Sequence, residues 1–265
     1  MAMDDDARPV GGDRPEGTPR PVALMKRILA LEGLAQTHGR SWENVHVSPD
    51  FAAALAPYRG TRLGRQELEG ELIEDVAGSL WPRALIEASR VREAPRDGYA
   101  RVVVGVDPPA SAEGVCGICV CVLGRDGLLY VLADASVEGA SPEQWARAVA
   151  HAAELWGADR VAAEVNNGGD MVTSVLRRAA PALPVRPVHA SRGKVARAEP
   201  AAAAFERREA RFAGCFPELE DQLTGMTQAG GYEGPGRSPD RADAMVWAMT
   251  KLMQPARALP SIRAL

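Results

Sequence analysis

Three carboxylates occur in this sequence at positions where a charged side chain is costly. Asp107 ends the apolar run VVVGV, Glu164 lies within the apolar run VAAEV, and Asp243 lies in the apolar helical pattern ADAMVW. Asp240 precedes Asp243 by three residues and therefore shares its face of the expected helix. A buried ionised carboxylate is strongly destabilising unless a cation or a metal ion lies beside it. The pattern therefore indicates acids that are kept for their chemistry.

Each acid also has a structural explanation. Asp107 stands before two prolines, where an acid can form a turn at the end of a strand, and Asp240 stands at a helix start, where the helix dipole favours an acid. Glu164 is harder to explain in this way because strand interiors seldom keep an unpaired Glu. Asp134 and Asp170 also lie near expected strand ends, and we interpret both as structural or supporting residues.

Clustered acids without Cys or His companions suit hard, oxygen-preferring cations such as Mg²⁺ or Mn²⁺. Two such ions about 3.5–4 Å apart can activate a water molecule and stabilise the leaving oxygen of a phosphodiester. A metal ion would also resolve the burial problem of the acids. The sequence therefore favours a metal-assisted hydrolytic site over a purely structural role for these residues.

The elements that must position the acids follow an α/β pattern. Three apolar strands come first, with Arg125–Gly127 as a hairpin turn between the second and the third, and strands then alternate with helices. Further strands are expected at 160–165 and 183–190, and helices at 141–157, 170–180, 194–209 and 238–253. This order predicts a mixed central sheet with helices on both faces. Acids on the first strand, the fourth strand and the last helix can converge at one end of such a sheet, as in the ribonuclease H-like fold.

Four segments are expected along the chain. Residues 1–20 have the composition of a disordered lead, residues 21–96 contain helical patterns at 21–35 and 65–80, residues 97–254 form the α/β domain, and residues 255–265 are a tail. The break APRDG before residue 99 reads as the linker between the helical segment and the α/β domain.

Between about residues 18 and 253 the chain resembles the C-terminal nuclease half of the large terminase subunit of tailed phages, prophages and gene transfer agents. The resemblance is carried by six segments in the order of the family: TPRPVALMKRILA, YRGTRLGRQELEGELIEDVAGSLW, VVVGVDPPAS, AAEVNNGGDMV, KVARAEP and SPDRADAMVWA. It implies that Asp107, Glu164 and Asp243 bind two Mg²⁺ or Mn²⁺ ions, with Asp240 as a helper where some relatives place histidine. All four acids would then belong to the catalytic site.

The resemblance implies a metal-dependent endonuclease that cleaves double-stranded DNA with little sequence preference during viral or gene-transfer-agent genome packaging. Its partners would be DNA, the portal and the small terminase subunit, in the cytoplasm of a bacterial host. The sequence contains no Gly-x-x-x-x-Gly-Lys-Ser/Thr phosphate loop, so we expect no ATP site in this chain. By resemblance, residues 21–96 look like the end of the ATPase motor domain and its linker, and the chain looks like a fragment or a truncated form.

The net charge of −4 excludes an overall basic coat, but basic residues are concentrated locally. Nine basic and three acidic residues lie between Arg177 and Arg211. Within this stretch we expect Arg192, Lys194 and Arg197 to contact the DNA backbone, although a solvated helix face is the alternative for part of it. The Gly-rich loop at 227–237 could act as a flap over the substrate or serve as a simple connection.

Other readings of the sequence remain open. No apolar run is long enough to cross a membrane, and Cys116, Cys119 and Cys121 fit buried strand thiols better than a zinc site or disulfides. A sugar-kinase or actin-like ATPase also has an apolar strand that ends in Asp, but such sites need Gly and a hydroxyl where this chain has two prolines. A branched-DNA resolvase or a transposase would share the acids. A non-catalytic module that docks the packaging motor is the non-enzymatic alternative.

Overall fold

The computed structural model describes residues 76–95, 98–111, 113–191 and 193–254, together with single residues and short stretches between residues 28 and 70. By its internal contacts the chain divides into two compact units, Met1–Glu74 and Asp75–Leu265. The described part of the first unit contains the 3-10 helix η1 (Ser41–Glu43) and the helix α2 (Pro49–Leu55). The expected lead, the tail and most of the helix at 21–35 lie outside the described residues.

The second unit begins with a segment that we had expected to precede the α/β domain. It contains helix α4 (Arg83–Ala88) and strand β1 (Arg90–Val91), which pairs in parallel with β8 (Ala210–Ala213). The helix expected at 65–80 is wrong for its described end, because residues 76–80 form a turn and an antiparallel bridge from Ser79 to Thr227. Gly78 has a φ of 71°, which continues a turn rather than a helix.

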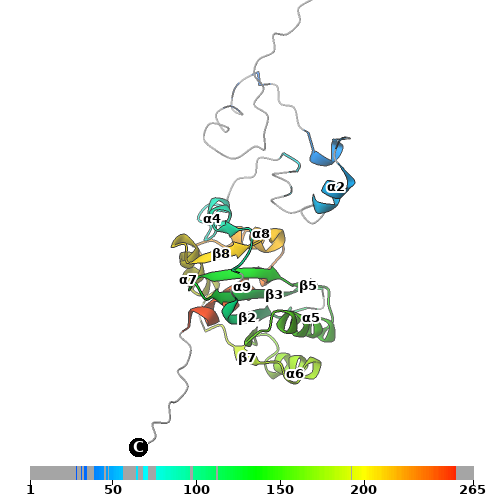
Figure 1. Cartoon of the computed structure of the whole chain (residues 1–265), viewed down its shortest axis with the longest axis vertical. Coiled ribbons are helices and arrows are strands. Elements are labelled where there is room, and N and C mark those ends of the chain that lie inside the picture. Colours follow the sequence, from blue (N-terminus) through cyan, green and yellow to red (C-terminus); the bar gives the residue numbers. More distant parts are fainter. Residues whose placement is uncertain are drawn as a thin grey trace, which may run out of the picture. The chain divides into compact units, whose positions relative to one another are not determined.

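An eight-stranded mixed sheet forms the centre of the second unit (Figure 1). Its strand order is β1-β8-β4-β3-β2-β6-β7, and β5 pairs with β3. The remaining strands are β2 (Tyr99–Asp107), β3 (Val115–Gly124), β4 (Leu129–Asp134), β5 (Val137–Glu138), β6 (Arg160–Glu164) and β7 (Val185–Val188). The sequence predicted β2, β3, β4, β6 and β7, and the hairpin turn between β3 and β4 is confirmed, with Gly127 at a φ of 81°. Strands β1, β5 and β8 were not predicted.

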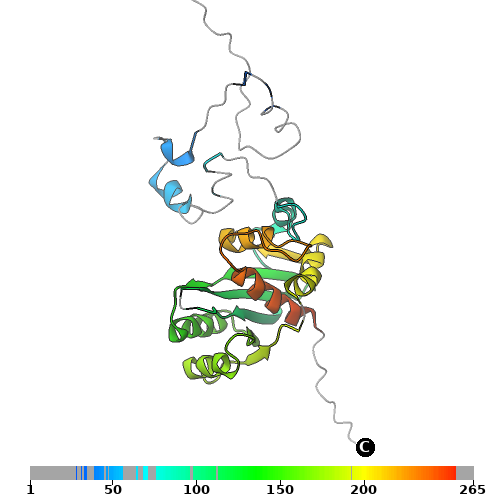
Figure 2. The same ribbon diagram turned by 180° about the vertical axis from the view of Figure 1, so that it is seen from behind.

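Helices cover both faces of the sheet, as predicted. Helices α5 (Pro142–Leu155) and α6 (Asp170–Ala179) pack on one face, where they share a buried cluster with Val102, Val104 and Val106. Helices α7 (Lys194–Glu206), α8 (Pro217–Thr224) and α9 (Asp240–Met253) pack on the opposite face with Val103, and Figure 2 shows α9 lying across the strands there. Side chains alternate between faces along a strand, so Asp107 points to the side of α9.

A buried ionic group joins α4 and β1 to α8, and we call it the Glu220 cluster. The Glu220 side chain is fully buried and accepts hydrogen bonds from Arg83 at 2.9 Å and from Arg90 at 2.8 and 3.0 Å. Its other bond comes from the backbone N–H of Phe216 at 2.8 Å, and Arg83 also pairs with Asp221 at 2.9 Å. Each buried carboxylate of this cluster therefore has a guanidinium partner, and residues 83–90 belong structurally with the second unit.

No helix among the described residues is long and apolar enough to cross a membrane.

Candidate acidic active site

The first two acids of the site end neighbouring strands. Strands β2 and β6 run parallel, with Val106 beside Ala163, and each ends at the next residue, Asp107 or Glu164. The carboxyl ends of parallel strands meet at the same edge of a sheet, so these two acids emerge side by side. By alternation along the strands both face α9.

Asp240 and Asp243 lie in the first turn of α9 and are directed to the same edge. The start of α9 has no cap from its own preceding residue. Instead, Oε1 of the buried Gln222 on α8 accepts hydrogen bonds from the backbone N–H groups of Arg241 at 2.8 Å and Ala242 at 3.2 Å. A side chain from another helix thus satisfies the first orphan donors of α9 and fixes where its first turn begins.

Two glycines allow α9 to lie directly on the backbone of the sheet. A Cβ on Gly105 of β2 would stand 1.9 Å from the carbonyl oxygen of Ala244, and a Cβ on Gly117 of β3 would stand 1.9 Å from that of Asp240. No side chain fits at either position without moving the helix. The close approach brings the first turn of α9 down to the strand end that carries Asp107, which pairs with Gly117 across β2 and β3.

The four acids interact electrostatically, and we call Asp107, Glu164, Asp240 and Asp243 together the acidic site. Burial raises the pKa of Asp107 well above its usual range, and the charges of Asp243, Glu164 and Asp240 raise it further. Burial is also the main cause of the raised pKa values of Asp240 and Asp243, while Lys194 opposes both shifts. The structure therefore brings all four predicted acids into one region of mutual repulsion.

Two cations predicted to contact DNA lie at this site. Nζ of Lys194 stands 2.7 Å from Oδ2 of Asp243. The guanidinium of Arg197 lies 3.3 Å from Glu164 and 3.6 Å from Asp243, and it stacks on the ring of Trp247 with its central carbon 4.5 Å from the ring centroid. The indole N–H of Trp247 donates to Glu164 at 2.6 Å. The predicted contact Arg192 lies outside the described residues.

The site fits a divalent cation by its donors, but it is not preassembled around one. Carboxylate oxygens are the ligands that Mg²⁺ and Mn²⁺ prefer, and the half-buried Asp107 has no hydrogen bond or ion pair to another described residue. No group of three or more His, Cys, Asp or Glu among the described residues is arranged to hold a metal ion. Lys194 and Arg197, rather than a metal ion, offset part of the negative charge of the acids.

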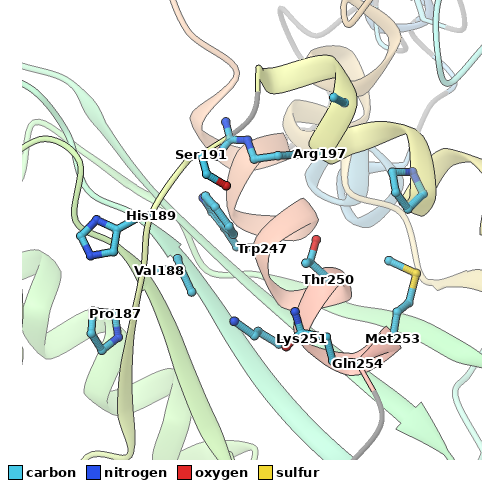
Figure 3. Close-up of a pocket in the computed structure, with 12 residues that line it drawn as sticks. Pro187, Val188, His189, Ser191, Arg197, Trp247, Thr250, Lys251, Met253 and Gln254 are labelled. Carbon is cyan, nitrogen blue, oxygen red and sulfur yellow. The ribbon is translucent and has the colours of Figure 1, made fainter.

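A pocket of about 630 Å³ adjoins the acidic site (Figure 3). Arg197 and Trp247, which both contact Glu164, also form part of its wall. From there it extends past His189 and Ser191 toward Lys251 near the end of α9. This pocket could not be predicted from the sequence, because its walls come from two segments, 187–200 and 247–254, that are far apart in the chain.

The other candidate residues from the sequence analysis lie at helix starts, strand ends and turns of the fold. Asp134 at the end of β4 pairs with Arg241 at 2.9 Å and so helps to hold the start of α9. Asp170 begins α6 and is exposed. Within the Gly-rich loop, Thr227 and Gly231 exchange backbone and side-chain hydrogen bonds at 3.1–3.2 Å, which closes a compact turn. The expected role of this loop as a flap stays a prediction.

Cys116, Cys119 and Cys121 are buried on β3, as predicted. They belong to a strand at the centre of the sheet, and no disulfide or metal group includes them among the described residues.

Comparison with solved structures shows which proteins share this fold. The large terminase nuclease of thermophilic phage G20c with bound magnesium has a TM-score of 0.50 at 15% identity, over 66% of this chain and 98% of that one. The manganese-soaked, inhibitor-bound terminase nuclease domain of human cytomegalovirus has a TM-score of 0.52 at 14% identity, over 65% and 95%. The large terminase of thermophilic bacteriophage D6E with ADP has a TM-score of 0.53 at 12% identity, over 78% and 53%. This chain therefore spans about half the length of the D6E protein.

Comparison with curated protein sequences gives no match. Residues 104–252, however, match the family described as the terminase RNaseH-like domain. This match includes all four residues of the acidic site, and together with the shared fold it confirms the predicted ribonuclease H-like architecture. Because the matched region covers more than half of the sequence, the chain belongs to the terminase RNaseH-like domain family.

Proposed function

We propose that this chain is a metal-dependent endonuclease that cleaves double-stranded DNA with little sequence preference during packaging of a viral or gene-transfer-agent genome. The observation that carries the proposal is the acidic site, in which the half-buried Asp107 lies among three further carboxylates and Lys194 and Arg197 offset part of their charge. Such an excess of negative charge suits a site that receives divalent cations. The magnesium-bound neighbour from phage G20c and the manganese-soaked neighbour from human cytomegalovirus support the same interpretation.

In this proposal Asp107, Glu164 and Asp243 hold two Mg²⁺ or Mn²⁺ ions, and Asp240 assists from the preceding turn of α9. When bound, the ions supply charge stabilisation to the attacking and leaving oxygens of the phosphodiester. The chain orients their ligands: Trp247 donates to Glu164, and Gln222 fixes the start of α9 beneath Asp243. These contacts orient Glu164 and fix the backbone of the first turn of α9 before a substrate arrives.

DNA would be held through its backbone. Arg192, Lys194 and Arg197 belong to the basic stretch that adjoins the acidic site, and contacts from such side chains to phosphates carry no sequence information. This supports cleavage with little sequence preference. We further propose residues 97–254 as the nuclease domain and residues 21–96 as the end of a motor domain and its linker, of which residues 83–90 pack on the nuclease domain. The portal and the small terminase subunit would be partners.

Plasmid cleavage tests the proposal directly. Supercoiled plasmid incubated with Mg²⁺ or Mn²⁺ should be nicked and linearised, and Asp107→Asn should lower the rate at least about 100-fold, because charge stabilisation by bound ions contributes several kcal/mol. Asp170→Asn is the matched control, since it removes one exposed acid outside the acidic site. Circular dichroism checks that both variants fold.

Undiminished cleavage by Asp107→Asn would refute the assignment of the acidic site. The mapped ends of the linear product test the second element of the proposal: ends scattered over the plasmid indicate little sequence preference, whereas a few fixed ends contradict it. A four-way junction offered beside linear duplex separates packaging-type cleavage from a resolvase, which would prefer the junction.

A further inference from the structure

The two cations at the acidic site differ in how firmly they are held. Lys194 and Arg197 lie three residues apart on one face of α7, so both reach toward α9 and β6. The side chain of Arg197 is only 10% exposed, whereas that of Lys194 is 45% exposed. The same face of one helix thus presents one buried cation and one that is open to solvent.

Arg197 is fixed from several directions. It contacts Glu164 and Asp243, and its guanidinium lies over the ring of Trp247, which itself donates to Glu164. Displacing Arg197 would break its contacts with Glu164, Asp243 and Trp247 together. We therefore regard Arg197 as a permanent part of the acidic site.

Lys194 is held at one end only. Its ammonium group contacts Oδ2 of Asp243 at 2.7 Å and Oγ of Ser238 at 3.0 Å. It is the first residue of α7 and follows Gly193, and its flexible four-carbon stem can redirect the charge without moving the helix. Asp243, by contrast, is 3% exposed at its side chain, so the loss of Lys194 leaves a buried carboxylate with only the longer contact to Arg197 at 3.6 Å among the described cations.

We propose that Lys194 is an exchangeable counter-ion of the acidic site: it neutralises Asp243 when no divalent ion is bound and transfers to a DNA phosphate when duplex binds. This inference rests on the proposed metal-dependent nuclease function. A phosphate that draws Lys194 away leaves Asp243 free for a divalent ion, and an ion on Asp243 leaves Lys194 free for a phosphate. Coupling between two ligands is reciprocal, so each should strengthen the binding of the other.

The first test measures Mn²⁺ binding without DNA, by titration with detection of free Mn²⁺ by electron paramagnetic resonance. Lys194→Met keeps the apolar stem and removes the competing charge, so we expect Mn²⁺ affinity to rise about two- to fivefold, the upper range of an exposed ion pair. Lys251→Met is the matched control: it removes the same charge from the last turn of α9, about 12 Å along the helix from Asp243, where screening by salt leaves little effect.

The second test measures the binding of a fluorescent 20-base-pair duplex in EDTA, where no cleavage occurs, by anisotropy. Asp243→Asn should tighten binding several-fold in the wild-type background because it releases Lys194 toward phosphate. The same substitution should have a much smaller effect in the Lys194→Met background. A general loss of repulsion between the acidic site and DNA would instead tighten binding equally in both backgrounds.

Unchanged or weaker Mn²⁺ binding by Lys194→Met, or an equal effect of Asp243→Asn in both backgrounds, would overturn the inference. Neither readout depends on cleavage. If the protein cleaves plasmid through Asp107 but fails these tests, the nuclease proposal stands and the exchange of Lys194 is wrong. If no variant binds Mn²⁺, the metal-dependent function fails first, and the anisotropy cycle still decides whether Lys194 is released toward DNA.

Discussion

Two regions of the second unit bury carboxylates, and they do so in opposite ways. In the Glu220 cluster, Glu220 and Asp221 face the two guanidinium groups of Arg83 and Arg90, and Glu220 also accepts a backbone hydrogen bond. At the acidic site, Lys194 and Arg197 pair with Asp243 and Glu164 among four carboxylates, and burial together with neighbouring acids raises the pKa of Asp107. The buried carboxylates of the first region are balanced by guanidinium groups, with the more exposed Glu87 as a further partner of Arg90, whereas the second region has an excess of negative charge.

The difference separates a structural ionic group from a candidate functional one. Removing one partner from a balanced buried cluster leaves an uncompensated charge and destabilises the fold. Removing an acid from a repulsive cluster lowers the repulsion in the folded state instead, and it impairs only the binding of the ligand that the cluster receives. Substitutions in the two regions should therefore have opposite effects on stability.

The largest effect on stability is expected in the balanced region. Glu220→Gln keeps the shape of the side chain but leaves Arg83 and Arg90 with a neutral partner, so the free energy of unfolding should fall by about 3–5 kcal/mol. Urea denaturation followed by circular dichroism measures the change. If the free energy of unfolding fell by less than about 1 kcal/mol, the Glu220 cluster would not be the stabilising ionic group that distinguishes it from the acidic site.

The close contact between α9 and the sheet gives the second prediction. Gly117→Ala places a methyl group against the carbonyl oxygen of Asp240, so the free energy of unfolding should fall by about 1–3 kcal/mol and cleavage should fall with it. Gly193→Ala is the control for stability, because its Cβ meets no atom within 4 Å and its φ of −57° suits alanine. Equal stability of both variants in urea would show that the packing of α9 on the sheet does not require glycine at position 117.

Helix α8 connects the two regions and gives the third prediction. It carries Glu220 and Asp221 toward α4 and β1, and its next residue, Gln222, caps the start of α9. Gln222→Ala should lower the free energy of unfolding by about 1 kcal/mol, the usual effect of a lost helix cap, and should lower the cleavage rate through the position of Asp240 and Asp243. Plasmid cleavage by the folded fraction measures the second effect, and an unaltered rate would make Gln222 a stabilising residue only.

The smallest effect concerns pH. The pKa of Asp107 is raised in the folded protein, so the folded state keeps its proton to higher pH than the unfolded state. Without metal, the free energy of unfolding should fall as the pH rises from the usual range of an aspartate through the raised pKa, with a slope of at most about 1.4 kcal/mol per pH unit for one proton. Asp107→Asn should reduce this slope and be at least as stable as the wild type near pH 8. Urea denaturation in EDTA across pH 4–8 measures this slope. The same slope for the wild type and for Asp107→Asn would mean that Asp107 does not have a raised pKa.

The sequence allowed much of the sheet to be predicted. Long apolar runs such as VVVGV and clear helix signals such as the Ser141 cap and Pro142 identify their elements locally, and the cap is formed in the structure. Strand β8 and helix α8 were missed for a physical reason. The four residues of β8 form a strand because β4 and β1 lie beside them, and α8 is short with few apolar residues of its own.

The acids of the site could be recognised because a carboxylate in an apolar run is conspicuous in any sequence. The cations that pair with these acids, and the side chain that caps α9, could not be recognised from the sequence. The pairing of Lys194 with Asp243 and of Arg197 with Glu164 joins residues 49 and 33 positions apart, and the cap from Gln222 joins two helices. From the sequence both cations could be assigned only to DNA, because their neighbours on α7 are all that the local pattern shows; the fold adds their contacts to the acids.

The contact of α9 with Gly105 and Gly117 has a mechanical consequence. Where a helix rests on main-chain atoms there is no compressible layer of side chains beneath it, and close-packed interiors transmit displacement rather than absorb it. The backbone that carries Asp240 and Asp243 is therefore tied rigidly to the strands that carry Asp107. Any adjustment of the site to an incoming ligand must then come from rotations about side-chain bonds, at rates far faster than hinge motions of the fold.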